Sequence, residues 1–374
     1  MTADALAPHY SQFRVRERVL LTGHSHQAWP DVAFDGQREA FADAAEYVDE
    51  KWDRAEAKAE RVRDGFRALL GEPRGDIALG ASTHDLVLRF LSALDLKARP
   101  KLVTTDGEFH TLRRQLGRLH EASIEVVRVA AEPVATLAER VSHAVDEFTA
   151  AALVSSVLFT SSRIVPGLPF LARECERHGA ELLVDAYHQL GVVPFELGGL
   201  EAAWVVGGGY KYLQLGEGNC FLRLPPQAQA MRPVITGWYG EFDSLAAAAA
   251  WGDTQYSSGG HRFAGATYDP TSHYRAARVF DFFAHHDLTP HVLRGISLRQ
   301  TTLIAQRLGR DESREPFGGF VALTTPRAAE LRDALRASDI RTDVRGDVLR
   351  LGPAPYVSDA QIHHALDLLT AMMA

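Results

Sequence analysis

One lysine on a glycine-rich turn constrains this 374-residue chain more than any other feature. It is Lys211, in the stretch Gly207-Gly208-Gly209-Tyr210-Lys211-Tyr212-Leu213, where a tyrosine stands on each side of it. A lysine amine can attack a carbonyl compound and hold it as a Schiff base. A lysine near glycines is more often simply solvated, so this interpretation needs a chemical partner elsewhere in the chain.

An acidic residue at the end of an apolar stretch is that partner. Leu182-Leu183-Val184-Asp185 reads as a strand that ends in an acid, 26 residues before Lys211. Pyridoxal phosphate (PLP) needs both groups, because a lysine holds it as a Schiff base and a carboxylate keeps its ring nitrogen protonated. Strands that end in aspartate are common in α/β proteins. The pair therefore suggests PLP and needs support from the surrounding residues.

Composition and charge narrow the class of protein. The chain is 46% hydrophobic and 24% charged, which is typical of a globular protein with one large domain and a smaller one. Its net charge is −8 and it has no basic tract, so we expect no nucleic-acid partner. No apolar run approaches the length of a membrane span, and the N-terminus lacks the apolar segment of a signal peptide. We therefore expect no membrane partner.

The sulfur and histidine content argues against disulfides and metals. Cys175 and Cys220 are the two cysteines, and both fall in apolar-patterned segments, so a disulfide framework is not indicated. A reducing cytoplasm is the expected location. The 16 histidines are scattered and form no metal-binding pattern, so no metal site is predicted.

Strands and helices alternate through the first two thirds of the chain. Expected strands cover 76–80, 102–105, 124–129, 151–156, 182–185 and 204–206, and helical patterns separate most of them. This order predicts an α/β fold with a mostly parallel sheet wrapped by helices. Ligands of such sheets bind beyond the carboxyl ends of the strands. Ser82, Phe109, Ser156 and Asp185 all fall at or just past such ends, and this convergence is stronger evidence than any one motif.

Small hydroxyl residues begin one of these helices. Ser82 and Thr83 follow the expected strand 76–80 and precede a helical pattern. A helix start of this kind can cradle an anion, because its free N–H groups and the helix dipole point at the ligand. The alternative is a plain helix cap without a ligand.

The chain is expected to divide into three parts. Residues 1–30 are an irregular arm, which is either a surface turn or a segment that closes over a cleft. Residues 31–270 form a large PLP-binding domain that opens with a long helical pattern, which is expected to be packing structure. Its apolar residues are Phe34, Phe41 and Val48, which recur every seven residues, joined by Trp52, Val62, Phe66 and Leu69. Residues 271–374 form a smaller α+β domain that packs with the arm.

These residues resemble the fold-type I PLP enzymes of the class V aminotransferase group, and within it kynureninase. The sharpest match is Tyr210-Lys211-Tyr212-Leu213, since kynureninases carry a tyrosine directly before the Schiff-base lysine. Asp185-Ala186-Tyr187-His188 resembles the family's Asp-x-Ala-His, with an aromatic residue where the alanine would stand. Gly237-Trp238-Tyr239-Gly240 is similar to its Gly-Trp-Phe-Gly, and 347–356 is similar to its C-terminal arginine segment. The resemblance implies an aspartate aminotransferase-like fold with a sheet of the seven-stranded type.

The resemblance also implies roles for individual residues. Lys211 would hold the cofactor and move the substrate's Cα proton, with Tyr210 as a proton relay. Asp185 would pair with the pyridine N–H, supported by His188. Phe109 would stack on the ring, or His110 would if the register differs by one. The phosphate contacts would be Ser82, Thr83, Tyr210 and Trp238. The substrate contacts would be Thr267 and Arg350, and Arg350 would bind the substrate carboxylate through a bidentate fork.

For function, the resemblance implies cleavage of the Cβ–Cγ bond of L-kynurenine or 3-hydroxykynurenine to the anthranilate and alanine. It also implies a homodimer with the active site at the interface. Kynureninases usually have Ser-Asn where this chain has Gly265-Ala266-Thr267, which keeps open another class V activity, an aminotransferase or an amino-acid lyase. Arg350 keeps an alternative too, a structural salt bridge with Asp343 or Asp347.

Overall fold

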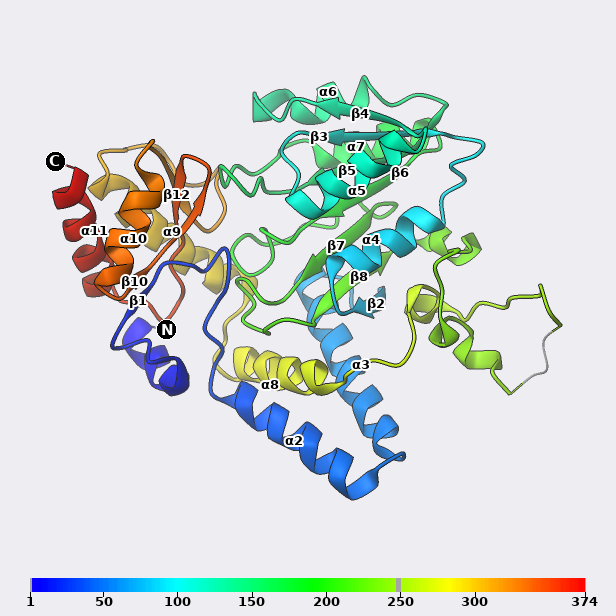
Figure 1. Ribbon diagram of the computed structural model, residues 1–374, viewed down its shortest axis with the longest axis horizontal. Coiled ribbons are helices and arrows are strands. Elements are labelled where there is room, and N and C mark those ends of the chain that lie inside the picture. The colour runs from blue at the N-terminus through cyan, green and yellow to red at the C-terminus, as the bar shows by residue number, and fades with distance from the viewer. Residues whose placement is uncertain (1, 247–249, 374) are drawn as a thin grey trace.

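A seven-stranded sheet is the central layer of the molecule (Figure 1), whose computed structural model describes residues 2–246 and 250–373. The strands lie in the order β2-β8-β7-β6-β5-β3-β4. All neighbours pair in parallel except β8, which runs antiparallel to both β2 and β7. The strands are β2 (Asp76–Gly80), β3 (Lys101–Thr105), β4 (Glu125–Val129), β5 (Thr149–Ser155), β6 (Glu181–Asp185), β7 (Trp204–Gly208) and β8 (Cys220–Leu224). The predicted α/β class with a mostly parallel sheet is confirmed.

Helices cover the sheet because the connections between its parallel strands must cross over it. Every residue of β3, β5, β7 and β8 is buried, as expected for strands covered on both faces. Four helices connect the strands from β2 to β6 in chain order: α4 (Thr83–Ser92), α5 (His110–Glu121), α6 (Leu137–Ser142) and α7 (Leu168–Arg177). This arrangement leaves the carboxyl ends of the parallel strands along one edge, where the predicted site residues meet.

The expected long helix near the N-terminus is two helices, α2 (Val32–Tyr47) and α3 (Lys51–Leu70). Val48 stands between them with a φ of 49°, a value that a β-branched residue rarely adopts. The expected packing holds for Val62 and Phe66, which are buried, and is wrong for the three residues that recur every seven positions. Phe34, Phe41 and Val48 are 56%, 78% and 69% exposed.

A stripe of small residues makes the packing face of α2 in place of the phenylalanines. Ala33, Gly36 and Ala40 are buried, and α2 packs on α8 (Thr271–His285) as Figure 1 shows. A Cβ atom on Gly36 would lie 2.6 Å from the carbonyl oxygen of Tyr274, so the two helices touch through their backbones. Close contact here depends on small side chains, and the larger stripe is left facing outward.

A smaller unit forms the C-terminal part. Its sheet has the order β11-β12-β9, from β9 (Val321–Thr324), β11 (Asp343–Arg345) and β12 (Val348–Leu351), all antiparallel. The helical stretch that precedes it is two helices, α8 and α9 (Pro290–Arg307), with Asp287 between them at a φ of 52°. The two later helices are α10 (Ala328–Ala337) and α11 (Asp359–Met373).

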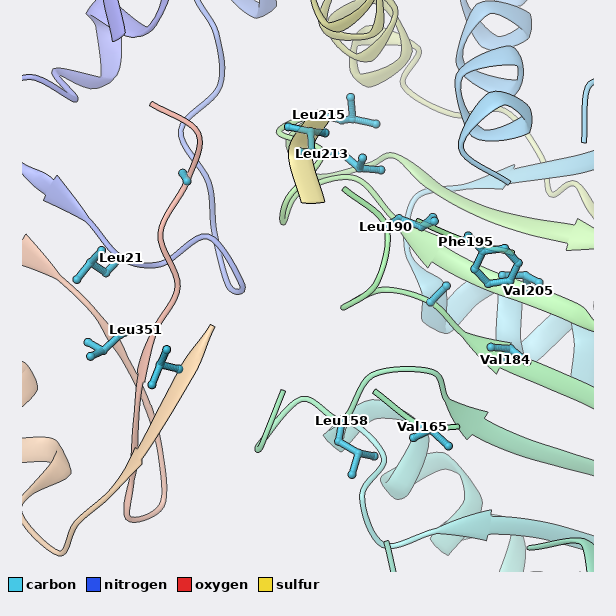
Figure 2. Close-up of a cluster of buried hydrophobic side chains, with 14 of the residues drawn as sticks. Leu21, Leu158, Val165, Val184, Leu190, Phe195, Val205, Leu213, Leu215 and Leu351 are labelled. Atoms are coloured by element: carbon cyan, nitrogen blue, oxygen red, sulfur yellow. The ribbon is translucent and has the colours of Figure 1, made fainter. Parts of the chain in front are cut away.

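The N-terminal arm is tied to this smaller unit. It begins with α1 (Ala3–Leu6), and β1 (Val19–Leu20) then pairs in parallel with β10 (Ile340–Arg341). The backbone N–H of Gly352 donates to the carbonyl oxygen of Leu21 over 2.8 Å. Figure 2 shows Leu21 beside Leu351 in the buried apolar cluster. The contact between the arm and the smaller unit is therefore both hydrogen-bonded and apolar, whereas the domain boundaries at residues 30 and 270 stay predictions.

No helix within residues 2–246 and 250–373 has both the length and the hydropathy that a membrane crossing needs.

Candidate functional site

A cavity of about 290 Å³ lies at the carboxyl ends of β5, β6 and β7. Its wall brings together residues that are far apart in the chain: Ser82, Thr83, Phe109, Ser155, Asp185, Tyr187, His188, Tyr210, Lys211 and Cys220. Ser155 and Asp185 are level with each other because β5 and β6 pair in parallel register there. Seven of the ten residues expected at the site, Ser82, Thr83, Phe109, Asp185, His188, Tyr210 and Lys211, therefore line one cavity.

Lys211 lies in the wall with only 6% of its surface exposed. Burial lowers the pKa of its amine from 10.5 to about 7; Asp185 opposes this shift, while Arg350 and Arg345 add to it. Burial penalises the ammonium form, so a large share of the amine is neutral near pH 7. A neutral amine is the form that can act as a nucleophile or a base.

His188 holds the end of Lys211. Its Nε2 lies 2.7 Å from Lys211 Nζ. Burial, and then the positive charge of Lys211, lowers the pKa of His188 well below its usual range. The imidazole is therefore neutral, and its tautomer decides whether Nε2 accepts a hydrogen bond from the amine or donates one to it. No protein group in the described residues meets Nδ1, which is buried.

Asp185 ends β6 and faces the same cavity. Its Oδ1 accepts a hydrogen bond from the Tyr187 N–H over 2.8 Å. Burial raises the pKa of the carboxyl above its usual range, while the Tyr187 N–H and Lys211 act in the opposite direction. A protonated ring nitrogen bound beside Asp185 would stabilise the carboxylate, so this residue is suited to the pairing role that the sequence suggested.

Aromatic rings surround the amine. Lys211 Nζ lies over the rings of Tyr187, Phe109 and Tyr210, at 4.3, 5.5 and 5.8 Å from their centroids. Phe109 lines the cavity, whereas its neighbour His110 is not among the lining residues. The geometry thus selects Phe109 over the alternative as the residue available to stack on a ring.

The start of α4 forms the other end of the cavity. Ser82 is the N-cap, and its Oγ accepts a hydrogen bond from the Asp85 N–H over 3.1 Å. The predicted alternative of a helix cap is therefore present. Ser82 and Thr83 also line the cavity, so the helix start is placed to receive an anion as well.

The cavity matches PLP group by group. The cofactor has an aldehyde, a pyridine nitrogen, a flat ring and a phosphate, and the cavity presents an amine, a carboxylate, aromatic faces and a helix N-terminus. Its volume is close to the lower end for small-molecule sites, about 300 Å³. Among the described residues, the buried Nδ1 of His188 has no hydrogen-bond partner. The residues present therefore fit PLP.

Arg350 lies next to this cavity but not in its wall. It is 2% exposed, its Nη1 donates to the carbonyl oxygen of Phe159 over 2.6 Å, and its Nη2 pairs with Asp343. The salt bridge to Asp343 that the sequence left open is present. The resemblance implied a free bidentate fork. In the structure both terminal nitrogens of Arg350 already have protein partners, so the fork is not free. Nε is buried without a hydrogen bond in the described chain, and the expected contact of Arg350 with a substrate carboxylate stays a prediction.

Trp238 and Thr267 lie apart from Lys211 in this chain. The indole Nε1 of Trp238 donates to Thr267 Oγ1 over 3.2 Å. Thr267 lines a neighbouring cavity of about 600 Å³, which shares Ala81, Glu217 and Gly218 with the Lys211 cavity. Trp238 is 41% exposed. One chain alone does not bring these two residues to the amine, so their expected roles at the cofactor and the substrate stay predictions.

Glu108 is a buried acid at the site that sequence reasoning missed. It is 2% exposed and accepts hydrogen bonds from Thr105 Oγ1, the Ser155 N–H and Ser155 Oγ at 2.7, 3.1 and 2.6 Å. Burial raises its pKa from 4.5 to about 7; the hydrogen bonds lower it, and Asp185 raises it further. Its position directly before Phe109 at a strand end was the available signal.

The arm also reaches the site, through His24 and His26. His24 is fully buried, with Nε2 3.6 Å from Asp343 Oδ2, and burial lowers its pKa to about 3. The ring of His26 stacks on Tyr210 at 5.0 Å. The sequence left open that the arm closes over a cleft, but it did not single out these two residues, because their contacts depend on the pairing of β1 with β10.

Both cysteines are buried and free. Cys220 lines the cavity and Cys175 lies in α7; burial raises the pKa of both thiols to about 12, so both stay protonated. Across 2–246 and 250–373, no three His, Cys, Asp or Glu side chains come together in a way that could hold a metal ion.

Comparisons with known proteins find distant relatives over nearly the full length. No family model matches the chain. It is 24% identical to an uncharacterized aminotransferase, YcbU, of Bacillus subtilis (strain 168), with 88% of each chain covered. It is 27% identical to a kynureninase of Burkholderia pseudomallei (strain 1106a), with 98% of this chain and 92% of that protein covered.

Two solved structures share the fold. A C-DES mutant with glycine covalently linked to its PLP cofactor matches with a TM-score of 0.83 at 16% identity, over 97% of this chain and 98% of that one. An apo cysteine desulfurase from Thermococcus onnurineus NA1 matches with a TM-score of 0.81 at 14% identity, over 100% of this chain and 98% of that one.

Proposed function

We propose that this chain, a PLP-dependent enzyme of the class V group, is a kynureninase-type hydrolase that cleaves the Cβ–Cγ bond of L-kynurenine or 3-hydroxykynurenine. The products would be anthranilate or 3-hydroxyanthranilate, and alanine. The observation that carries the proposal is Tyr210-Lys211 in one cavity with Asp185 and Phe109. The kynureninase relative, which is matched over 92% of its length, supports the same substrate class.

PLP, when bound, supplies an electron sink that stabilises negative charge at the substrate's Cα. Lys211, Asp185, Phe109, Ser82 and Thr83 would hold it. The neutral amine of Lys211 takes the Cα proton, and His188 keeps Nζ in place through their 2.7 Å contact. Burial keeps the base neutral near pH 7, which is the condition for this proton transfer.

Tyr210 serves the later proton transfers. Burial raises the pKa of its hydroxyl, so the group stays protonated and can donate. Water adds to the substrate's γ-carbonyl carbon, the Cβ–Cγ bond breaks, and its electron pair goes to Cβ, which takes up a proton. The atoms of the substrate and one water then balance those of the aryl acid and alanine.

The absorbance spectrum of the purified protein with PLP tests the proposal. We expect a visible band that is absent in Lys211→Ala, and the release of fluorescent anthranilate and of alanine on addition of kynurenine. A band that kynurenine leaves unchanged, with no anthranilate, would contradict the substrate but not the cofactor. No band after incubation with PLP would contradict the whole proposal.

A second candidate is an aminotransferase or an amino-acid lyase of the same group. Gly265-Ala266-Thr267 in place of Ser-Asn favours it, and a cystine C–S lyase shares the fold at 16% identity. An amino donor that converts the visible band to a shorter wavelength, and a keto acid that restores it, would identify an aminotransferase. A desulfurase that uses a cysteine nucleophile is disfavoured, because both thiols are buried and protonated.

The proposed assembly is a homodimer with the site at its interface, and the proposed location is the cytoplasm. Trp238 and Thr267 would then meet the site of the other copy. The exposed apolar residues Phe34 and Phe41 on α2, and Val48 directly after it, favour burial against a partner. Light scattering of Phe41→Glu tests this: a dimeric parent and a monomeric variant are expected, and a monomeric parent would contradict the proposal.

A further inference from the structure

Tyr187 is the aromatic residue nearest to the catalytic amine, and the proposed mechanism does not use it. Its ring centroid lies 4.3 Å from Lys211 Nζ, compared with 5.5 Å for Phe109 and 5.8 Å for Tyr210. It is 7% exposed and lines the Lys211 cavity. Tyr187 therefore shares the cavity with every residue that would hold PLP.

Two rings face the same amine without touching each other. Lys211 Nζ lies over both Phe109 and Tyr187, and in the described part of the chain these two rings make no ring contact. Carbon atoms in contact are about 3.5 Å apart, so a flat ring stacked on both faces needs roughly 7 Å between its outer neighbours. The cavity between the two side chains is where such a ring would fit.

The position of the Tyr187 ring is fixed from several sides. Its backbone N–H donates to Asp185 Oδ1, and its ring packs on Tyr210 at 5.0 Å. A Cβ atom on Gly208 would lie 2.5 Å from the Tyr187 hydroxyl oxygen, so the glycine before the lysine turn provides the space for this side chain. The hydroxyl oxygen is 3.9 Å from Cys220 Sγ. Tyr187 thus lies along the wall from the amine to β8.

We propose that Tyr187 is a further cofactor contact, whose ring forms the second aromatic wall of the PLP site, opposite Phe109. The inference rests on the cofactor part of the proposed function and is independent of the substrate. A protonated pyridine ring is cationic, and the face of a tyrosine ring attracts a cation as well as stacking on it. Burial raises the pKa of the Tyr187 hydroxyl, so the ring stays neutral beside Asp185.

The test measures PLP binding to the full-length apoprotein, with tryptophan fluorescence as the readout. Tyr187→Phe keeps the ring, and Tyr187→Leu keeps an apolar side chain without a flat face. We expect Tyr187→Phe to bind PLP as the parent does, and Tyr187→Leu to bind about threefold to tenfold more weakly, the effect of one aromatic pair. Tyr47→Leu on α2, outside the cavity, is the matched control and should bind as the parent does.

Circular dichroism and thermal unfolding of each apoprotein show whether the variant folds. The visible circular dichroism of bound PLP gives a second readout, which should change in Tyr187→Leu and not in Tyr187→Phe. Unchanged affinity and visible signal in folded Tyr187→Leu would overturn the inference alone. Equal weakening in both variants would assign the effect to the hydroxyl and overturn the stacking contact. A parent that takes up no PLP would overturn the proposed function together with this contact.

Discussion

Two buried clusters of charged groups lie close together in this molecule, and burial acts on them with opposite results. Around Lys211, desolvation dominates: the pKa of the lysine falls to about 7, and the pKa values of Asp185 and Glu108 rise. In the C-terminal unit, pairing dominates: burial acts to raise the pKa of Asp343, but His24, Arg350 and Arg345 hold it well below its usual range. The groups around Lys211 are shifted toward their neutral forms, whereas Asp343 and Arg350 form an ion pair.

The difference lies in the partners that the fold provides. Asp343 stands directly opposite Arg350 on neighbouring antiparallel strands, and their side chains meet. Lys211 faces a neutral imidazole and three aromatic rings in place of a carboxylate within hydrogen-bond distance. Reactive groups with shifted pKa values are typical of active sites, whereas satisfied ion pairs hold structure. By this criterion, the residues around Lys211 are the candidates for chemistry, and the Asp343–Arg350 pair is a candidate for a structural role.

The largest expected effect is loss of stability on removal of Asp343. Asp343→Ala leaves the buried Arg350 without its counter-ion, which typically costs about 3–5 kcal/mol. Urea unfolding of the apoprotein measures the change. Asp347→Ala, an exposed aspartate in the same hairpin, is the control and should change stability by less than about 0.5 kcal/mol. Equal effects in both variants would contradict a stabilising role for the buried Asp343–Arg350 ion pair.

Removal of the Lys211 amine is expected to increase stability, whereas removal of the Asp343 carboxylate decreases it. Its pKa is 10.5 ordinarily and about 7 in the fold, so between these values the unfolded chain binds a proton that the folded chain does not. Stability therefore rises with pH through this window, and the buried charge costs most below pH 7. Lys211→Met should stabilise the apoprotein by a few kcal/mol at pH 6, at about 1.4 kcal/mol per pKa unit, with the gain gone near pH 10.5.

Lys97→Met, at an exposed position, is the matched control for that experiment, and its effect on stability should be small. Destabilisation by Lys211→Met at pH 6 would mean that the amine is paired in the apoprotein, and would end the comparison with Asp343.

A smaller effect with a defined pH dependence is expected at Glu108. Its pKa is raised from 4.5 to about 7, so the folded chain holds a proton that the unfolded chain has lost between these values. The stability that this group contributes is present below pH 4.5 and is lost as pH rises through 7. Glu108→Gln should flatten the fall in unfolding free energy between pH 5 and pH 8, whereas Glu125→Gln, at an exposed position in β4, should keep the slope of the parent. If the unfolding free energy of Glu108→Gln falls with pH as steeply as that of the parent, the raised pKa of Glu108 is contradicted.

The smallest expected change in unfolding free energy comes from removal of one tyrosine hydroxyl in each region. Tyr356, near the arm, accepts a hydrogen bond from the Ala28 N–H and donates to Gln27 Oε1 over 2.7 Å. Tyr356→Phe should cost about 1 kcal/mol in unfolding free energy, because a buried acceptor and donor lose their partner. Tyr187→Phe should cost less, since the contact of its hydroxyl with Cys220 Sγ is long, at 3.9 Å. The reverse order would show that the hydroxyl of Tyr187 is held more firmly than its distances indicate.

Much of the Lys211 cavity could be predicted because its residues carry local signals. Asp185 ends a run of apolar residues, Ser82 begins a helical pattern and Lys211 sits among glycines. Parallel strands bring such ends to one edge whatever their loops do, so strand ends were enough to place these residues together. Tyr187 and Glu108 lay next to predicted residues and were still missed, since local pattern does not say which neighbour turns toward the cavity.

The sequence by itself determined the alternation of strands and helices, the α/β class and the set of groups that suits PLP, because these depend on periodicity and on residues at strand ends. Only the tertiary structure decided which groups are paired. The antiparallel register of β11 and β12 gives Arg350 its aspartate, and the packing of Gly36 on α8 leaves Phe34 and Phe41 exposed. Pairing and burial depend on neighbours brought together by the whole fold, and a local pattern does not contain them.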